Sequence, residues 1–533
     1  MTPGDSAAPA VPPTAPSRDD SMRMAELIAS LSFAIDLGVG MPMEWMLRSC
    51  LMAMRLGEAA GLEPARRRNL YYLALLRHIG CTSTSAAAAR DFGGDLGMAE
   101  GFELDLENPA EALRFLFTVV AKDKPLPQRI AILAKLMAGG QALKRENHMS
   151  HCEVAERLAE RLAIDPGLPL LFRQIYSRWD GKGTPSELKG NAIALEVRVV
   201  HLAQDAATLF SAGGKPAVLE AVGRRAGGMY DPDLAALFLK DAEALMAPLA
   251  VPSVWDAVLA AEPGTKARIA ADRLDEALIA ISDFTDFKSP YVLGHSRAVA
   301  SLVTGAAARA GLTPDEARDV KRAAWLQDIG RVGVSAGIWG KPRALDEGEW
   351  ERVRMHPYFT ERILARSPAL ARLSGLAALH HERLDGSGYH KRAAGANLPM
   401  AARLLAAADT YQAMREDRPH RKALTAAAAA EELRREAKSG RLDATAVEAV
   451  LETAGHAPAP GRAPGKAAAD LSAREIEVLR LMARGLSNKQ TGNALCISAK
   501  TVGHHIQHIY AKIGASTRAA AALYAVEHGL LDR

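Results

Sequence analysis

The chain has 533 residues, which is too many for one hydrophobic core, so we expect several domains. Hydrophobic residues make up 49% and charged residues 24%, which excludes a wholly disordered chain, while a formal net charge of +4 is too small for the whole surface to bind nucleic acid. Four scattered cysteines argue against a disulfide framework, and no apolar run approaches the roughly 18 residues of a membrane span, so we expect a cytoplasmic protein without a membrane partner.

In chain order the composition indicates five segments, and frequent alanines favour helices throughout, so the predicted fold class is all-α. Residues 1–20 are rich in Pro, Ala and Ser and are expected to form a disordered tail. Residues 21–250 and 261–454 carry helical patterns. Residues 455–469 are a Pro/Gly/Ala linker, and residues 470–533 are a compact last domain.

An internal repeat relates the first two helical regions. The segment Arg178–Gly183 matches Arg383–Gly388, and His151 matches His356 at the same offset. We therefore predict that residues 21–250 are a diverged copy of the middle region. Most polar side chains of the middle region are replaced in this copy: the positions of Asp328, His380, His381 and Asp409 hold His78, Ile175, Tyr176 and Gln204. Packing, dimerisation and sensing stay open as its role, and so does a ligand pocket.

Imidazoles and carboxylates recur along the middle region on several helical segments. They are His295, Asp328, His356, His380, His381 and Asp409. This ligand mixture suits a divalent transition metal held inside a helical bundle. Gln327 directly precedes Asp328, where a His-Asp pair would complete the set.

Residues 284–451 resemble the HD-GYP family of metal-dependent phosphodiesterases that cleave cyclic di-GMP. The resemblance is carried by the runs His380–Tyr389, Leu345–Glu351 and Ala408–Tyr411. It implies an all-α bundle with two or three metals, which orient phosphate oxygens and generate a hydroxide nucleophile. The implied metal ligands are His295, Asp328, His356, His380, His381 and Asp409, with Gln327 at the position of the missing histidine.

The chain departs from the family pattern at four positions, with Gln327 for His, Arg331 for Lys, His390 for Pro and Gln412 for Asp. One metal position keeps a full set of four ligands: Asp328, His356, His380 and His381. The other keeps His295, Asp328 and Asp409 but loses an imidazole, and an amide oxygen is a weaker ligand. We expect iron or manganese, one or two per chain, with no metal as the remaining alternative.

Candidate catalytic residues are Asp328, Lys341 and Arg383. The two cations could meet phosphate, but each could equally be a solvated surface charge. Asp385, Gly386 and Gly388 could simply build a turn. The expected ligand is a cyclic dinucleotide or another phosphorylated molecule.

The last domain has the pattern of a helix-turn-helix. Ser472 and Glu475 form a capping box, Ser487 and Gln490 form a second, and Ser498 precedes a longer helix with an apolar back and a cationic front. Residues 471–531 resemble the LuxR-type DNA-binding domain. The resemblance implies that Lys489, Lys500, Thr501, His504, His505 and Lys512 face double-stranded DNA.

These patterns together predict two tandem HD-type helical bundles followed by a four-helix LuxR-type module. We predict a DNA-binding transcriptional regulator, acting as a homodimer because single modules of this size bind weakly. Its HD-GYP-like module would sense a metal or nucleotide with reduced or no catalysis. The alternative is an active metal-dependent cyclic dinucleotide phosphodiesterase coupled to the DNA-binding domain.

Overall fold

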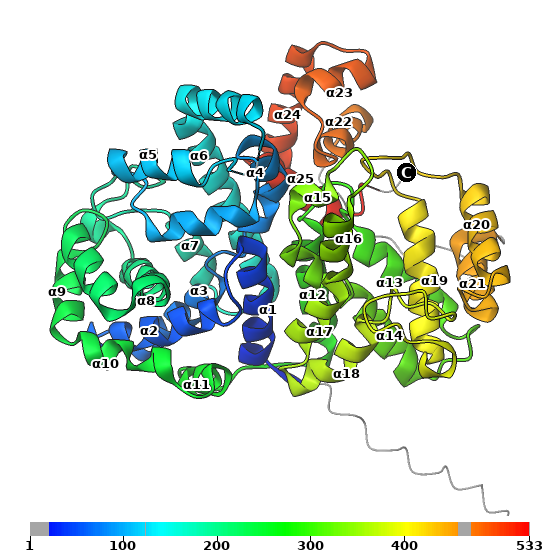
Figure 1. Ribbon diagram of the computed structural model, residues 1–533, viewed down its shortest axis with the longest axis horizontal. Coiled ribbons are helices and arrows are strands. Elements are labelled where there is room, and N and C mark those ends of the chain that lie inside the picture. Colours follow the sequence, from blue (N-terminus) through cyan, green and yellow to red (C-terminus); the bar gives the residue numbers. More distant parts are fainter. Residues whose placement is uncertain (1–20, 123, 457–470, 532–533) are drawn as a thin grey trace, which may run out of the picture.

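The computed structural model describes residues 21–122, 124–456 and 471–531, and over these residues the fold is helical, as predicted. The predicted disordered tail and nearly all of the predicted linker lie outside the described residues. Two large helical lobes lie side by side, and a small group of helices sits above their junction (Figure 1). Among the described helices, none is long and apolar enough to cross a membrane.

The N-terminal lobe contains eleven α-helices among its described residues. They are α1 (Met24–Val39), α2 (Trp45–Ala59), α3 (Pro64–Leu76), α4 (Ser85–Asp91), α5 (Pro109–Thr118), α6 (Leu126–Leu162), α7 (Leu168–Phe172), α8 (Leu195–Arg225), α9 (Pro232–Lys240), α10 (Ala242–Met246) and α11 (Val254–Ala261). Short 3₁₀ turns are η1 (Cys81–Thr84), η2 (Leu96–Glu103), η3 (Gly190–Ala192) and η4 (Ala247–Ala250). Helix α6, with 37 residues, runs along one side of this lobe and reaches the junction.

The middle lobe is built from ten α-helices in its described part. They are α12 (Ala271–Asp286), α13 (His295–Ala306), α14 (Pro314–Leu326), α15 (Ala336–Trp339), α16 (Glu347–Arg354), α17 (His356–Leu364), α18 (Pro368–Ala377), α19 (Met400–Met414), α20 (Ala426–Lys438) and α21 (Ala444–Leu451). The 3₁₀ turns η5 (Ile329–Gly333) and η6 (Gly395–Asn397) and the π-turn η7 (Glu452–His456) complete it. Capping boxes start α14 at Thr313 and α16 at Asp346, so local sequence fixes where these helices begin.

The two lobes share one hydrophobic core and are joined by buried polar contacts. Strand β1 (Met22–Arg23) pairs antiparallel with β2 (Arg268–Ile269), which ties the start of one lobe to the start of the other. The buried ammonium of Lys288 lies 2.7 Å from Asp95, and Asp95 also accepts a hydrogen bond from Ser335 at 2.6 Å. Burying a lysine is costly unless it is paired, so this contact fixes how the lobes meet.

The internal repeat is visible in the packing of equivalent glycines. A Cβ on Gly330 would lie 2.0 Å from the carbonyl oxygen of His356, and one on Gly80 would lie 2.1 Å from that of His151. Gly388 and Gly183 likewise leave no room for a Cβ. Gly388 lies against the backbone of residues 381–383, and Gly183 lies against the equivalent backbone of residues 176–178. The same close approaches therefore recur in both lobes.

The last group of helices packs around buried apolar residues that are continuous with the core of the lobes and include Val478, Leu479, Val502, Ile506 and Leu523. Its helices are α22 (Ala473–Ala483), α23 (Asn488–Leu495), α24 (Ala499–Ile513) and α25 (Arg518–Glu527). Side chains of Ser472, Ser487, Ser498 and Thr517 cap these helices, as the sequence pattern predicts.

Candidate metal centre and DNA-binding surface

Five separate elements of the middle lobe bring their polar side chains to one buried point. His295 is the first residue of α13, Asp328 follows α14, His356 begins α17, the pair His380–His381 follows α18, and Asp409 lies within α19. Gly330 lets the turn after Asp328 approach the start of α17, because its missing Cβ would collide with the backbone there. Every predicted metal ligand except Gln327 belongs to one of the two metal-competent groups of the described chain.

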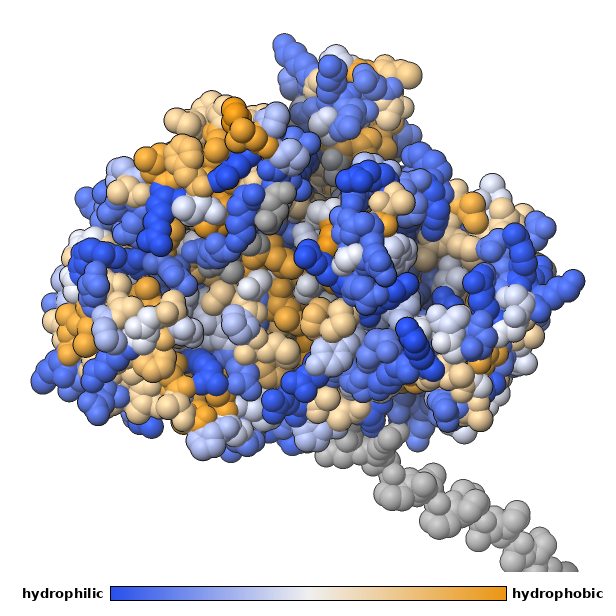
Figure 2. Space-filling view, viewed as in Figure 1, coloured by the Kyte–Doolittle hydropathy of each residue, from blue (hydrophilic) through white to orange (hydrophobic). Residues whose placement is uncertain are grey.

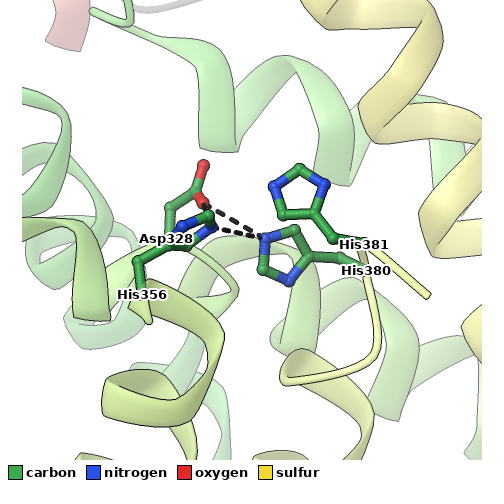
Figure 3. Close-up of side chains that lie close together, drawn as sticks. All are labelled: Asp328, His356, His380 and His381. Atoms are coloured by element: carbon green, nitrogen blue, oxygen red, sulfur yellow. Dashed lines mark hydrogen bonds and ion pairs between the residues drawn. The ribbon is translucent and has the colours of Figure 1, made fainter. Parts of the chain in front are cut away.

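The first group is Asp328, His356, His380 and His381, whose ligand atoms all lie within 4.8 Å of one another (Figure 3). The Nε2 atoms of His356 and His380 face each other at 3.1 Å and lie 3.5 and 3.4 Å from Oδ1 of Asp328. In Figure 3 the ring of His381 lies beside that of His380 and faces the space between the four side chains.

The protonation pattern of this group favours a cation. Nδ1 of His356 donates to the carbonyl of Val353 at 2.6 Å, and Nδ1 of His380 donates to that of Ala377 at 2.7 Å. Since carbonyl oxygens only accept, a neutral ring at either position keeps an unprotonated Nε2. Burial lowers the pKa of His356 to about 4 and that of His381 well below its usual value, so both are neutral at pH 7.

Asp328 completes this donor set. Neither of its buried carboxylate oxygens accepts a hydrogen bond from a described residue. Burial works to raise its pKa, but Arg331 and the facing imidazoles of His356 and His380 hold it well below the usual range. Oδ2 of Asp328 lies 3.1 Å from Nη1 of Arg331, while Oδ1 faces the imidazoles of His356 and His380. A buried carboxylate oxygen beside imidazole nitrogens fits a divalent transition metal, so the first group fits one metal ion.

The second group is His295, Asp328 and Asp409, and its polar atoms already have partners. Nε2 of His295 lies 3.0 Å from Oδ1 of Asp409, and its Nδ1 lies 2.9 Å from Oε1 of Glu416. Burial works to lower the pKa of His295, but Glu416 and Asp409 raise it to about 10. Both ring nitrogens of His295 thus lie within hydrogen-bond distance of a carboxylate, which favours the protonated ring while no metal is bound.

Gln327 and Arg331 occupy the rest of the second position. The Gln327 amide donates to Oδ1 of Asp409 at 3.1 Å, while its own carbonyl oxygen is buried without a partner in the described structure. Nη1 of Arg331 lies 3.1 Å from Oδ2 of Asp328, and the guanidinium stacks 4.8 Å over Trp339. The carboxylates of this position thus face the Gln327 amide and the Arg331 guanidinium, which compete with a metal for the same oxygens, so the second group fits a metal less well than the first.

The two predicted phosphate-contacting cations lie in different surroundings. Lys341 pairs with Glu349 and lies 3.6 Å from Asp346, both at the start of α16, so it belongs to neither metal group. Arg383 donates to the Thr410 hydroxyl at 3.2 Å, one residue from Asp409. Arg383 is therefore the predicted cation that the structure brings to the centre.

Sequence reasoning missed the parts played by two residues. Arg331 was noted only as a replacement for Lys, yet its buried guanidinium lies against Asp328. Glu416 carried no signal, because it stands seven residues beyond Asp409 in a charged loop, yet it holds Nδ1 of His295. A cation placed three residues after an aspartate was the one available hint, since such residues face each other on a helical turn.

In the N-terminal lobe the equivalent positions meet as well, but without metal-ligand chemistry. His78 lies 2.7 Å from the amide of Gln204, and His151 lies 2.9 Å from the Tyr176 hydroxyl. No group of this lobe's described residues has metal-ligand geometry. The side chains at these positions bond to one another.

The predicted DNA-facing residues lie on α23 and α24. Lys489, Lys500, Thr501 and His504 are exposed and His505 is half-buried, while Val502, Ile506 and Ile509 of the same helix are buried. Lys512 differs from the rest, because its ammonium lies 2.8 Å from the Glu475 carboxylate of the first capping box. The exposed face of α24 near its N-terminus has the shape and charge that a major groove accepts.

The opposite end of this module rests on α6. Glu153 accepts hydrogen bonds from the backbone N–H and the hydroxyl of Ser516 and from the hydroxyl of Thr517, at 2.8 to 3.0 Å. Arg157 donates to the carbonyl of Gly514 at 2.8 Å. The module is thus anchored by the ends of α24 and α25, and the predicted DNA face of α24 is left open.

Comparison with known proteins agrees with both parts of the molecule. Residues 280–446 match the HD domain family, and residues 469–525 match the bacterial regulatory proteins of the luxR family. The chain is 27% identical over 405 residues to a 3′3′-cGAMP-specific phosphodiesterase of Vibrio cholerae, covering 75% of this chain and 88% of that protein. It is 37% identical over 156 residues to a cyclic di-GMP phosphodiesterase response regulator of Xanthomonas campestris, covering 29% of this chain and 40% of that one.

A crystal structure of a cyclic GMP-AMP specific phosphodiesterase from Vibrio cholerae has a similar fold. The TM-score is 0.58 at 24% sequence identity, and the match covers 82% of this chain and 99% of that one. This coverage extends well beyond the HD domain match, so the likeness of fold includes the N-terminal lobe.

Proposed function

We propose that this chain, which carries an HD domain related to HD-GYP cyclic nucleotide phosphodiesterases and ends in a LuxR-type DNA-binding domain, is a transcriptional regulator that binds a cyclic dinucleotide without cleaving it. The metal-binding residues would be Asp328, His356, His380 and His381, holding one iron or manganese ion. A cytoplasmic location follows from a DNA target and is part of the proposal.

The observation that carries the proposal is the state of the second metal position. Gln327 stands at the position of the missing histidine and its amide donates to one oxygen of Asp409, while Oδ2 of Asp328 faces Arg331. A bound divalent metal can polarise a phosphate oxygen and lower the pKa of water, and a pair of metals stabilises both the attacking and the leaving oxygen. One metal supports binding of a phosphate group but lacks half of this arrangement.

The chain's own residues would position the ligand. Arg383, hydrogen-bonded to Thr410, supplies a cation beside His381, and Tyr389 lies with its ring 4.8 Å from that of His381. A guanidinium suits phosphate, and an aromatic face suits a nucleobase.

Metal content and turnover on the full chain purified without oxygen test the proposal. We expect about one metal per chain and no linear product from cyclic di-GMP or 3′3′-cGAMP with iron or manganese present. Gln327→His combined with Arg331→Lys should raise the content towards two metals. Two metals in the unchanged chain, or measurable turnover, would contradict the proposal.

The competing candidate is an active phosphodiesterase that also binds DNA. It is favoured by the similarity to a 3′3′-cGAMP-specific phosphodiesterase across 75% of the chain. Product formation that scales with a second equivalent of metal would establish it. DNA binding is tested separately with the full chain and duplex DNA at low salt, where failure to bind would count against both candidates.

A further inference from the structure

A cavity of about 750 Å³ opens in the N-terminal lobe between α4, α5, α6 and η2. This volume lies within the roughly 300–1,000 Å³ typical of small-molecule sites. Three phenylalanines, Phe92, Phe102 and Phe115, and the buried Leu136 contribute to its wall. The cavity therefore offers mainly apolar and aromatic surface.

One wall of the cavity is polar and lies where the middle lobe has its metal centre. The ring of His148 stacks on Tyr176 with centroids 3.9 Å apart, and the Tyr176 hydroxyl lies 2.9 Å from Nδ1 of His151. Nε2 of His151 lies 2.6 Å from the Thr84 hydroxyl, and Sγ of Cys81 lies 3.7 Å from the Tyr176 hydroxyl. The matching positions of the predicted repeat are His356 for His151 and His381 for Tyr176.

The cavity wall carries no net charge. Burial lowers the pKa of His151 to about 4 and that of His148 well below its usual value, so both are neutral at pH 7. The charged lining residues are already paired, Lys144 with Glu107 and Asp95 with Lys288. An anionic ligand would lose its hydration here without gaining a cation, so the wall disfavours phosphates and carboxylates.

We propose that this cavity is a second ligand site, for an uncharged, largely apolar or aromatic small molecule with one hydrogen-bonding group facing the wall of Tyr176 and His151. The site does not depend on the function proposed for the metal centre. It takes a different chemical class from a cyclic dinucleotide.

Helix α6 gives this site a physical connection to DNA binding. The helix lines the cavity from Leu136 to His151, and its next turns hold the C-terminal module through Glu153 and Arg157. A ligand that shifts α6 within the cavity therefore acts on an element that the module rests on.

Two fluorescent probes with the same ring system test the charge preference of the full-length protein. We expect 1-N-phenylnaphthylamine, which is neutral, to bind at one site per chain. Its sulfonated relative 8-anilinonaphthalene-1-sulfonate should bind at least about tenfold more weakly. Equal affinity for both probes, or no saturable binding of the neutral one, would overturn the proposal.

A cavity-filling substitution tests the location. Ala112→Trp places an indole against the cavity and should weaken binding of the neutral probe at least about tenfold, with Ala138→Trp as a second blocking variant if the first does not fold. Ala134→Trp is the matched control, because Ala134 is exposed on α6 and does not line the cavity. Exposed Phe117, Leu126 and Ile130 lie nearby on α5 and α6, where Figure 2 shows apolar residues gathered. Binding that survives in a folded blocking variant but falls in the control would assign the probe to that surface instead and refute the site.

Discussion

Removing one imidazole of the first metal group should abolish the stabilisation that a metal gives. The perturbation is His380→Ala, which deletes one of the two Nε2 atoms that face each other at 3.1 Å. A metal that binds only the folded state, present at 100 times its dissociation constant, stabilises that state by about 2.7 kcal/mol. For an unfolding unit of the size of the HD domain this raises the melting temperature by about 5–10 °C.

The variant should lose most of this shift. Changing even an outer partner of a metal ligand costs about 10–100-fold in affinity, so losing a ligand should cost at least about 100-fold. At the same metal concentration the dissociation constant then equals or exceeds that concentration. The remaining stabilisation is at most about 0.4 kcal/mol, a shift below about 2 °C.

Thermal melting with and without manganese, after removal of bound metal by a chelator, measures both shifts. His420→Ala is the matched control, because His420 is exposed and belongs to neither metal group. A manganese shift that persists in His380→Ala would refute the assignment of the first group. An equal loss in His420→Ala would show that the effect is not specific to the site.

Three further outcomes follow from the geometry. Burial lowers the pKa of His151 to about 4, while in the unfolded chain the pKa is about 6.5. The unfolded state therefore binds the additional proton, and the free energy of unfolding should fall by up to about 3 kcal/mol as pH falls from about 6.5 to about 4. Denaturant unfolding should show a smaller fall in His151→Gln, and an equal fall would contradict this. Gly388→Ala should weaken manganese binding at least about tenfold, because the added Cβ would lie 2.5 Å from Cα of Glu382 and displace the loop of His381. Gly375→Ala is the control: its Cβ would have no atom within 4 Å, so the binding isotherm should stay unchanged. Lys500→Met should reduce the salt dependence of DNA binding by about one unit of slope, whereas Lys512→Met should leave the slope unchanged because Glu475 already holds that ammonium; equal slopes in both variants would refute the distinction.

The sequence predicts the metal ligands, but it does not predict which other side chains form hydrogen bonds or ion pairs with them. His356, His380 and Asp328 lie in local runs with a specific family resemblance, so their convergence in a helical bundle could be expected. The spacing of Asp328 and Arg331 hints at their pairing, but the pairing of Glu416 with His295 depends on how the loop after α19 packs, and no local pattern encodes that packing. The same limit applies to the cavity, whose lining residues come from several elements between Gly38 and Tyr176.

The capped helices of the C-terminal module show the opposite case. Ser472, Ser487 and Ser498 each satisfy backbone N–H groups within three residues, so a short sequence window contains the whole interaction. The first three helices of the module therefore begin where the pattern places them. The contacts of the module with Glu153 and Arg157 cannot be predicted from such a short segment, because these two residues lie more than 300 residues away in the chain.

A single arginine joins both lobes to the DNA-binding module. Nη1 of Arg161 on α6 lies 2.5 Å from Oδ2 of Asp283 on α12 and 3.3 Å from Oε1 of Glu527 on α25. Asp283 also binds Arg297 at 2.6 Å, and Arg297 is two residues from His295 on α13. We therefore expect a shift of α6 at the cavity, or of α13 at the metal centre, to act on the module through this side chain.

Arg161→Met should uncouple these inputs without emptying either site, because Asp283 keeps its partner Arg297. In the unchanged chain we expect manganese, or the neutral probe, to change the dissociation constant for duplex DNA by a factor of about five or more, and in the variant this factor should fall towards one. Arg173→Met removes an ion pair with Glu156 at the exposed surface of the same lobe and serves as the control. Coupling of undiminished size in Arg161→Met would mean that the signal reaches the module by another contact, of which the hydrogen bonds of Glu153 are the next to test.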